Sequence, residues 1–269
     1  MRIPSLMAAA AAAALAAGAA AAAPTYPTFT VDTSALGGGG SLGTFVANDI
    51  SGQYHEQLTF TSASTFVVSL DFTAQGFNYD DTNAAASTSL TAAQTGLGSN
   101  YQLLAVLNGT GTYSTSGGTT TFSLNPGGDL NLSYDAGANA SFSAPAAPGG
   151  SFTIDANGDV ITTLATGVGI MGNGSVACTA PNLCGAFGQE TSFALTAAGA
   201  SFFVAPSPFY ALTLQSGQVE GFPVSVGTTV TSTGTLNAVF ASSVPEPAPL
   251  AMMGFALVGF LGTRYRRRA

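Results

Sequence analysis

The chain has 269 residues, of which five are basic and 13 are acidic. Arg2 and four arginines beyond residue 263 are the only basic residues, so residues 24–263 contain no lysine or arginine. This excludes nucleic-acid binding and the fork-like recognition of phosphate or carboxylate ligands, because both depend on Lys or Arg. We expect instead a surface of hydroxyls and amides that hydrogen-bonds sugars, water or neighbouring copies of the chain.

The N-terminus has the pattern of a secretory signal peptide. Arg2 precedes an Ala-rich run, Met7 to Ala23, which ends in small residues before Pro24. A short charged region, an apolar region and an Ala-x-Ala exit are the three parts of such a peptide. We therefore predict a signal peptide over residues 1–23 and export of the chain from residue 24 onward.

The body of the chain, residues 24–243, shows the alternation of β-strands. Every even position of residues 66–72 is apolar, and residues 130–134 repeat the pattern, as a sheet with one buried face requires. A first strand is expected at residues 28–31, and the one candidate helix, residues 84–95, could equally be a loop. We predict an all-β fold, an antiparallel β-sandwich or barrel-like domain between the signal peptide and a C-terminal transmembrane helix.

Turn residues predict how the strands connect. Asn-Gly, Ser-Gly-Gly and Ser-Gly sequences between apolar alternations are typical of β-hairpins. The expected hairpins join residues 152–154 to 160–164 around Asn157-Gly158, residues 109–112 to 119–124 around Ser116-Gly117-Gly118, and residues 210–214 to 219–222 around Ser216-Gly217, with a late pair at 224–226 and 235–240. Breaks are expected at residues 37–40 and 145–150, the second allowing a subdivision near residue 148.

The single histidine is a weak candidate for catalysis. On a strand, Tyr54 and Glu56 share one side and His55 the other, so His55 and Glu56 diverge. Asp49 or Asp71 could in principle orient the ring, but the chain has no Gly-x-Ser-x-Gly nucleophile motif. We predict that the protein is not an enzyme. Convergent carboxylates for glycoside hydrolysis stay open, because they need only meet in space.

Asp155, Asn157 and Asp159 resemble the beginning of a calcium-binding loop. The glycine stands inside this triplet, however, and no acidic residue occupies the position that completes an EF-hand. A hairpin turn explains the sequence better, so we predict no metal and no cofactor and keep the triplet as a weak candidate. Asp80-Asp81 is equally explained by a solvated loop.

Two cysteines, Cys178 and Cys184, are six positions apart. In an oxidising compartment an even number of closely spaced cysteines indicates a disulfide. The alternative, a redox or metal-binding pair, lacks the Cys-x-x-Cys spacing and other soft ligands. A loop this short stabilises the fold by roughly 2 to 2.5 kcal/mol at most.

The C-terminal segment, residues 244–269, combines three features in order. Val244-Pro245-Glu246-Pro247 precedes an apolar run over residues 250–262 and a basic tail of Arg264, Arg266, Arg267 and Arg268. The prolines favour an extended strip that presents Glu246, and the arginines orient the run with its basic end in the cytoplasm. The run is shorter than the about 20 residues of a stable span. A temporary anchor is therefore expected, with an ordinary single-span anchor as the alternative.

These three features resemble the PEP-CTERM sorting signal of Gram-negative bacteria, which an exosortase reads. Residues 47–60, 178–188 and 193–210 also look like segments of the flocculation-associated PEP-CTERM proteins. The resemblance implies export, a transient inner-membrane anchor through residues 250–262, and processing near Pro245 to Pro247.

The same resemblance implies an outer-surface or matrix protein with a structural or adhesive role in floc or biofilm formation. Exopolysaccharide and self-association are the partners that it suggests beside the exosortase. A glycan-active extracellular enzyme and a small-ligand binding module are the alternatives, and a deep apolar cavity would favour the second.

Overall fold

The computed structural model describes residues 27–37, 42–79, 88–179 and 183–241. The predicted signal peptide and sorting segment lie outside these residues. The elements are β1 (Phe29–Asp32), β2 (Thr44–Ala47), β3 (Asp49–Phe60), β4 (Thr65–Tyr79), β5 (Thr88–Ser89), α2 (Ala92–Thr95), β6 (Gln102–Ser116), β7 (Thr119–Leu124), β8 (Gly127–Asp135), β9 (Ser141–Ser143), β10 (Thr153–Asp155), β11 (Ile161–Val176), β12 (Leu183–Ser192), β13 (Ala194–Leu195), α3 (Ala197–Phe202), β14 (Phe203–Ala205), β15 (Leu212–Glu220) and β16 (Thr229–Ala241).

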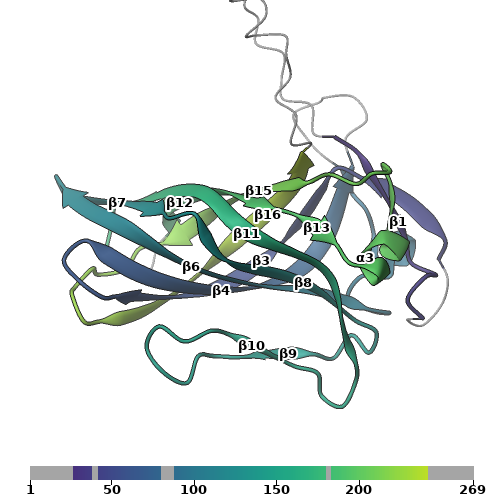
Figure 1. Cartoon of the computed structure of the whole chain (residues 1–269), viewed down its shortest axis with the longest axis horizontal. Coiled ribbons are helices and arrows are strands. Elements are labelled where there is room, and N and C mark those ends of the chain that lie inside the picture. The colour runs from purple at the N-terminus through teal and green to yellow at the C-terminus, as the bar shows by residue number, and fades with distance from the viewer. Residues whose placement is uncertain (1–26, 38–41, 80–87, 180–182, 242–269) are drawn as a thin grey trace, which may run out of the picture.

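The main sheet closes on itself. Its 11 strands have the order β5-β4-β3-β16-β15-β12-β11-β7-β6-β8, with β13 beside β11, and every pairing is antiparallel. A further pairing joins β4 to β6 over Thr65–Thr73 and Leu104–Thr112 and so closes the sheet into a ring; β4 and β6 lie side by side in Figure 1. The predicted all-β class is confirmed, in the barrel-like form. Strands from both sides of residue 148 belong to this one sheet.

Alternation along the strands separates the interior from the outside. On β4 the side chains of Phe66, Val68, Leu70 and Phe72 are buried on the inner side, as the sequence pattern predicted. The inner side of β8 supplies another predicted set, residues 130–134. Closure therefore places the apolar positions of nonadjacent strands in one common core.

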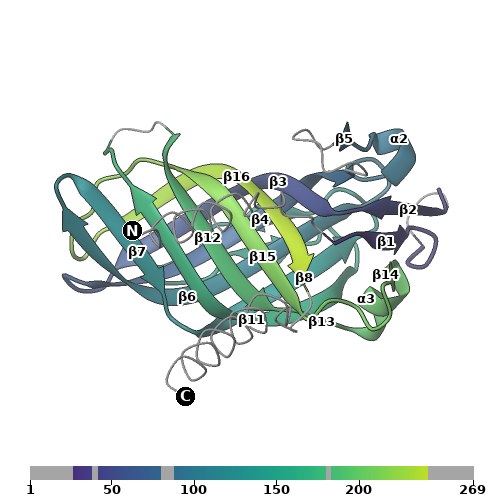
Figure 2. The same ribbon diagram turned by 90° about the horizontal axis from the view of Figure 1, so that it is seen from above.

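Aromatic side chains fill both ends of this core. At one end, near the β3–β4 and β6–β7 turns, Phe60 packs against Tyr113 with ring centroids 5.0 Å apart, and Phe66 packs against Phe122 at 5.5 Å. At the other end β1, β14 and α3 cover the opening (Figure 2), and Phe29 and Phe193 pack against Phe240 at 5.0 and 4.9 Å. Edge-to-face and tilted ring contacts of this kind add to the hydrophobic stabilisation of the core.

One predicted hairpin is confirmed. β6 and β7 pair from Gly111↔Leu124 to Ser116↔Thr119, with a turn at Gly117 and Gly118. Both glycines have positive φ, 60° and 84°. Two adjacent positive-φ positions are what a tight hairpin turn needs, and glycine adopts them without steric cost.

The hairpin predicted around Asn157-Gly158 has the turn but not the strand pair. Both residues have positive φ, yet β10 pairs with β9 and not with β11. Phe152 is buried and its N–H donates to the Ser69 hydroxyl on the outer side of β4, at 3.0 Å. The small β9–β10 sheet thus packs outside the ring (Figure 1), while β11 pairs within it.

The hairpin predicted around Ser216-Gly217 is wrong, because β15 runs unbroken from Leu212 to Glu220. Pairing with β12 on one side and β16 on the other satisfies its backbone and outweighs the local turn signal. The late pair is also wrong, since residues 224–226 form no strand and β16 pairs with β15 and β3. Of the candidate helix at residues 84–95, residues 84–87 lie outside the described chain, and the described part contains β5 and the four-residue α2.

A tyrosine packed over a glycine joins three strands inside the ring. Tyr54 of β3 is fully buried and donates a 2.7 Å hydrogen bond to the Gln218 carbonyl of β15. To reach it, the aromatic ring crosses β16 at Gly234, where an added Cβ would lie 2.8 Å from Tyr54 and closer still to the Gln218 carbonyl. Only glycine leaves room for this side chain.

We expect Gly234→Ala to lower the free energy of unfolding by about 2 to 3 kcal/mol, because overpacking displaces Tyr54. Urea unfolding of the purified protein measures the loss. Gly188→Ala is the matched control, since its Cβ would meet only the Gln215 carbonyl at 3.9 Å. The control should stay within about 0.5 kcal/mol of the wild type. Equal stability of Gly234→Ala and wild type would contradict the packing argument.

Candidate functional site

Two apolar cavities lie inside the closed sheet. One, the Glu56 cavity, has a volume of about 60 Å³ and is lined by Glu56, Leu58, Phe66, Phe122 and Phe222 among others. The second, the Phe240 cavity, has about 50 Å³ and is lined by Ile50, Phe72, Leu103, Phe193 and Phe240 among others. Leu70, Leu107, Phe187 and Gln189 line both. The two spaces are therefore neighbours, separated by these shared side chains.

Among the described residues, Glu56 is the only ionisable side chain that lines either cavity. It lies on the inner side of β3, opposite Leu70 of β4 and Ser232 of β16, and is only 8% exposed. No hydrogen bond joins its carboxyl group to any of the described residues. Burial raises its pKa from the ordinary 4.5 to about 8, because an apolar environment disfavours the charged form.

Tyr54 is the neighbouring titratable group on the same inner side. Burial raises the pKa of its hydroxyl, and the charges of Glu56 and Glu220 raise it further. Glu56 and Tyr54 are therefore both mainly neutral at neutral pH.

His55 points out of the sheet, as the alternation predicted, and is 61% exposed. Its Nδ1 lies 3.0 Å from Oδ1 of Asp71, the residue opposite on β4, which is 2% exposed. Burial raises the pKa of Asp71, and the hydrogen bond and charge of His55 oppose this rise. Asp49, the other predicted partner, instead binds the Asn78 amide at 2.5 Å.

A histidine oriented by an aspartate is two-thirds of a hydrolase triad, and the nucleophile is the missing part. In the described part of the chain, no hydroxyl group hydrogen-bonds to the His55 ring. The pair of exposed His55 and buried Asp71 links β3 to β4 without the geometry of an activated nucleophile.

The predicted calcium candidates form a turn. The Asp155 carboxylate accepts the Asn157 N–H at 3.0 Å, and the Asn157 amide donates to the Asn139 carbonyl at 2.6 Å. The Asp159 N–H donates to the Ala156 carbonyl at 3.0 Å. These groups serve the backbone of the loop, and no three His, Cys, Asp or Glu side chains of the described residues converge on a metal position.

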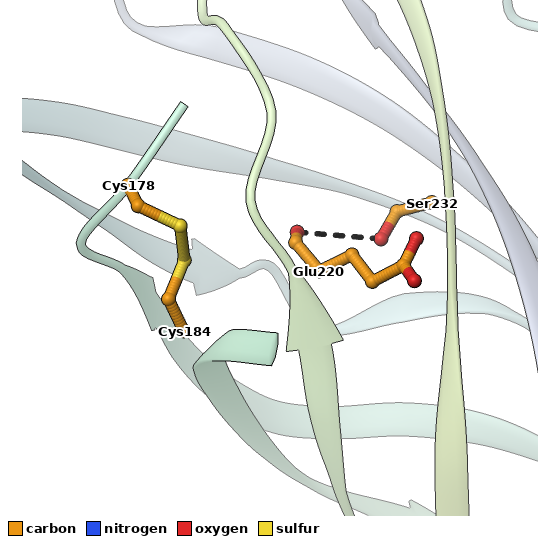
Figure 3. Close-up of a disulfide and its surroundings, with 4 residues drawn as sticks. All are labelled: Cys178, Cys184, Glu220 and Ser232. Atoms are coloured by element: carbon orange, nitrogen blue, oxygen red, sulfur yellow. Dashed lines mark hydrogen bonds between the residues drawn. A yellow bond between two sulfur atoms is a disulfide. The ribbon is translucent and has the colours of Figure 1, made fainter. Parts of the chain in front are cut away.

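The two cysteines form a disulfide between the end of β11 and the start of β12 (Figure 3). Beside it, the Ser232 hydroxyl donates to the Glu220 backbone carbonyl at 3.4 Å, which ties β16 to the end of β15. The disulfide closes a short loop at the same end of the ring as the β6–β7 turn, because Val176 pairs with Thr120.

The outer side of the sheet is nearly free of charge over a broad area, which we name the hydroxyl face. Its side chains lie in register across neighbouring strands, so that two adjacent rows can be traced from β6 toward β3. The first row is Thr112, Ser123, Asn173, Gly188, Ser216, Asn237 and Ser51, and the second is Ser114, Thr121, Ser175, Ala186 and Gln218. The exposed threonines of β16, Thr229, Thr231, Thr233 and Thr235, extend it. Figure 2 looks onto this side of the sheet.

The spacing of the hydroxyl face results from strand geometry. Alternate residues on one strand stand about 6.7 Å apart, and neighbouring strands about 4.8 Å apart. The face is therefore a regular lattice of donors and acceptors, bordered by Glu190 of β12 and the exposed apolar side chains of Met171 and Leu214.

Residues 243–268 match the family model of the PEP-CTERM protein-sorting motif. The matched segment contains Pro245, Glu246 and Pro247, the apolar run and the four arginines, and it lies outside the described residues. No curated protein and no solved structure matches the chain. None of the helices in the described ranges is long and apolar enough to cross a membrane.

The motif defines the class of protein. The chain is an exported substrate of exosortase, held transiently at the membrane by its C-terminal segment and then processed. The family model covers only this segment, so the role of the folded body depends on that body's own surfaces and cavities.

The site that sequence reasoning missed is the Glu56 cavity. The pattern did predict that Tyr54 and Glu56 share one side of a strand. It also held the signal that this side is the buried one, because Ile50, Leu58 and Phe60 occupy the same parity. Ring closure, which makes that side an enclosed interior, was the missing information.

The pKa of Glu56 predicts a stability profile. The unfolded chain loses this proton near pH 4.5 and the folded chain near pH 8, so the folded state holds the extra proton between these values. Relative to Glu56→Gln, wild-type stability is highest below pH 4.5 and falls by up to about 1.4 kcal/mol per pH unit until about pH 8. Above pH 8 the difference should be constant.

Urea unfolding at pH 5, 6, 7, 8 and 9 measures this difference profile. Glu190→Gln on the outer side of β12 is the matched control, and it should reproduce the wild-type slope. A flat difference between wild type and Glu56→Gln across this range would show that the carboxyl group is solvated in the folded protein.

Proposed function

We propose that the processed protein has a structural or adhesive role in floc or biofilm formation, together with exopolysaccharide. The observation that carries this proposal is the hydroxyl face, with its two in-register rows of uncharged side chains. Polysaccharides present dense hydroxyl groups and little charge, so a regular array of donors and acceptors is complementary to them. Likeness to the flocculation-associated PEP-CTERM proteins supports the same role.

The binding mode is non-covalent and repetitive. Each hydrogen bond to a sugar replaces one to water, so its net contribution is only about 1 kcal/mol. A lattice of such groups along a polymer adds these small terms, and several molecules on one strand add avidity. Absence of lysine and arginine from residues 24–263 removes ionic attraction as the alternative mode for anionic polymers.

A non-catalytic role is part of this proposal. The His55–Asp71 pair has no hydroxyl nucleophile on its ring among the described residues, and the rows of the hydroxyl face contain no carboxylate. A glycan-active enzyme would need two acids on either side of a bound sugar. The interior cavities favour a different second activity, the binding of a small ligand.

Thr231→Val with Thr235→Val removes two hydroxyls from the hydroxyl face and keeps the side-chain shape. With about 1 kcal/mol lost for each, we expect binding to the producing cells' exopolysaccharide to fall by about tenfold or more. Co-sedimentation of purified protein with the isolated polysaccharide measures the effect.

The matched control for this variant is Thr163→Val with Thr166→Val, which removes two exposed hydroxyls from the β8-paired half of β11, outside both rows. Its binding should equal that of the wild type. Unchanged polysaccharide binding by the β16 variant would refute the proposed face. Loss of self-association in sedimentation velocity, with polysaccharide binding intact, would identify a second copy of the chain as the partner instead.

Sorting depends on a different segment and has its own test. In cells that express the exosortase, we expect the wild type to lose the residues beyond the Pro245–Pro247 region and to reach the outer surface or the matrix. Glu246→Ala should stay uncut in the inner membrane. Intact mass and fractionation distinguish the two, and an uncut C-terminus in both proteins would mean that residues 250–262 are a plain anchor.

A further inference from the structure

The Glu56 cavity combines a buried acid with a wholly uncharged wall. Beside Glu56, the lining includes Leu58, Phe66, Phe122 and Phe222, and no described group accepts or donates a hydrogen bond at the carboxyl. A carboxyl group in such a place costs several kcal/mol relative to an apolar side chain of similar size. A buried polar side chain that faces a cavity without a partner indicates that something else provides the partner.

The partner cannot be a cationic side chain of the folded body. Residues 24–263 contain no lysine or arginine, and His55, the one histidine, points out of the sheet. Of the other acidic groups near this end, Glu220 carries a charge of the same sign. A lysine or arginine that pairs with Glu56 therefore cannot come from residues 24–263, and the mature, processed body has to obtain such a cation from elsewhere.

The shape of the space limits what this cation can be. The Glu56 cavity and the Phe240 cavity have volumes of about 60 and about 50 Å³ and meet at Leu70, Leu107 and Phe187. A metal ion needs several oxygen ligands and prefers carboxylates, whereas Glu56 is the only carboxyl group in this lining, which is mostly aliphatic and aromatic. A narrow molecule with one charged end and an apolar chain would match the lining, with the charged end in the Glu56 cavity and the chain passing the shared side chains into the Phe240 cavity.

We propose that the interior of the closed sheet is a binding site for a small unbranched primary amine, with its ammonium group on Glu56 and its alkyl chain directed past Leu107 and Phe187. The ammonium group donates hydrogen bonds to the carboxylate, and the chain gains contact with the apolar wall. Gln189, which lines both cavities, is a polar group that can accept a further hydrogen bond.

The number of protons released on binding depends on the protonation states of the free amine and of the free Glu56 carboxyl group. In water the amine is already an ammonium ion, while the free Glu56 carboxyl group is neutral below pH 8, because burial raises its pKa. Formation of the pair breaks the carboxyl O–H bond and releases that proton to solvent. Tyr54 stays neutral throughout, since the pKa of its hydroxyl is raised. Affinity should therefore increase about tenfold per pH unit below pH 8 and level off above it.

The test uses n-butylammonium chloride and the mature, processed protein, with isothermal titration calorimetry at pH 6, 7, 8 and 9 in constant salt. We expect one saturable site in the wild type and release of about one proton per butylammonium at pH 6, read from the dependence of the enthalpy on the buffer. n-Butanol, which has the same chain without the charge, should bind at least about tenfold more weakly at pH 8.

Two variants give the control. Glu56→Gln preserves size and removes the titrating group, so it should fold at neutral pH and bind butylammonium at least about tenfold more weakly. Glu190→Gln removes one acid from the outer side of β12 and should bind like the wild type, which separates the cavity from attraction to the acidic surface. Equal binding by Glu56→Gln, or no saturable binding of butylammonium to the wild type at pH 8, would overturn the proposal.

The result of the butylammonium binding test is independent of the proposed polysaccharide role. The valine variants of the hydroxyl face lie on the outer side of β16 and leave the cavities unchanged, so loss of one activity does not imply loss of the other.

Discussion

The pairing of β4 with β6 is the contact on which the rest of this structure depends. It joins Thr65–Thr73 to Leu104–Thr112 by a ladder of backbone hydrogen bonds and converts an open sheet into a ring. Without it, two long strands would present unpaired edges, and the inner side chains of β3 and β4 would face water. With it, the inner sides of β3, β4, β6, β11, β12, β15 and β16 share one interior. The burial of Glu56 is a direct consequence.

The interior is filled unevenly, and this explains the cavities. Large rings occupy both ends, where Phe60, Phe66 and Phe122 meet on one side and Phe29, Phe193 and Phe240 on the other. In the middle of the ring, two of the inward-facing positions are glycines. Gly217 and Gly234 leave room for the rings of Phe187 and Tyr54, which therefore lie close against β15 and β16. The remaining space is divided between the two cavities around Phe187.

Local patterns predicted the strands well and their partners poorly. The alternation over Phe66–Phe72 indicated the right strand and the right buried side, and the Gly117-Gly118 turn indicated the right hairpin. At Asn157-Gly158 the turn was right and the partner wrong, because β10 pairs with β9 and is held outside the ring, where the Phe152 N–H bonds Ser69 of β4. At Ser216-Gly217 the glycine lies within a continuous strand, where it leaves room for the ring of Phe187, and it does not mark a turn. These contacts are between residues far apart in the sequence, so a short sequence segment cannot reveal them.

The site illustrates the same division between local and tertiary information. Parity along residues 50–60 already puts Glu56 with Ile50 and Leu58, but a sheet with an open side would leave the carboxyl group half in water. Closure depends on residues far along the chain, so it could not be inferred from β3 alone. The composition without lysine or arginine predicts an uncharged, hydroxyl-rich surface, whereas the registry of that surface across β7, β11, β12, β15 and β16 comes only from the strand order.

The distribution of charge separates the two proposed activities. A surface that acts through many weak hydrogen bonds gains from having few charges, since repulsion between copies and salt dependence are both reduced. The same scarcity of charge makes Glu56 exceptional, because residues 24–263 supply no lysine or arginine that could neutralise it. In a chain that keeps Thr, Ser and Asn on the outside and Leu and Phe on the inside, an acid retained in the interior cannot be attributed to solubility or to an ion pair. The proposed amine ligand would account for it, and the proposed role of the hydroxyl face needs no such ligand.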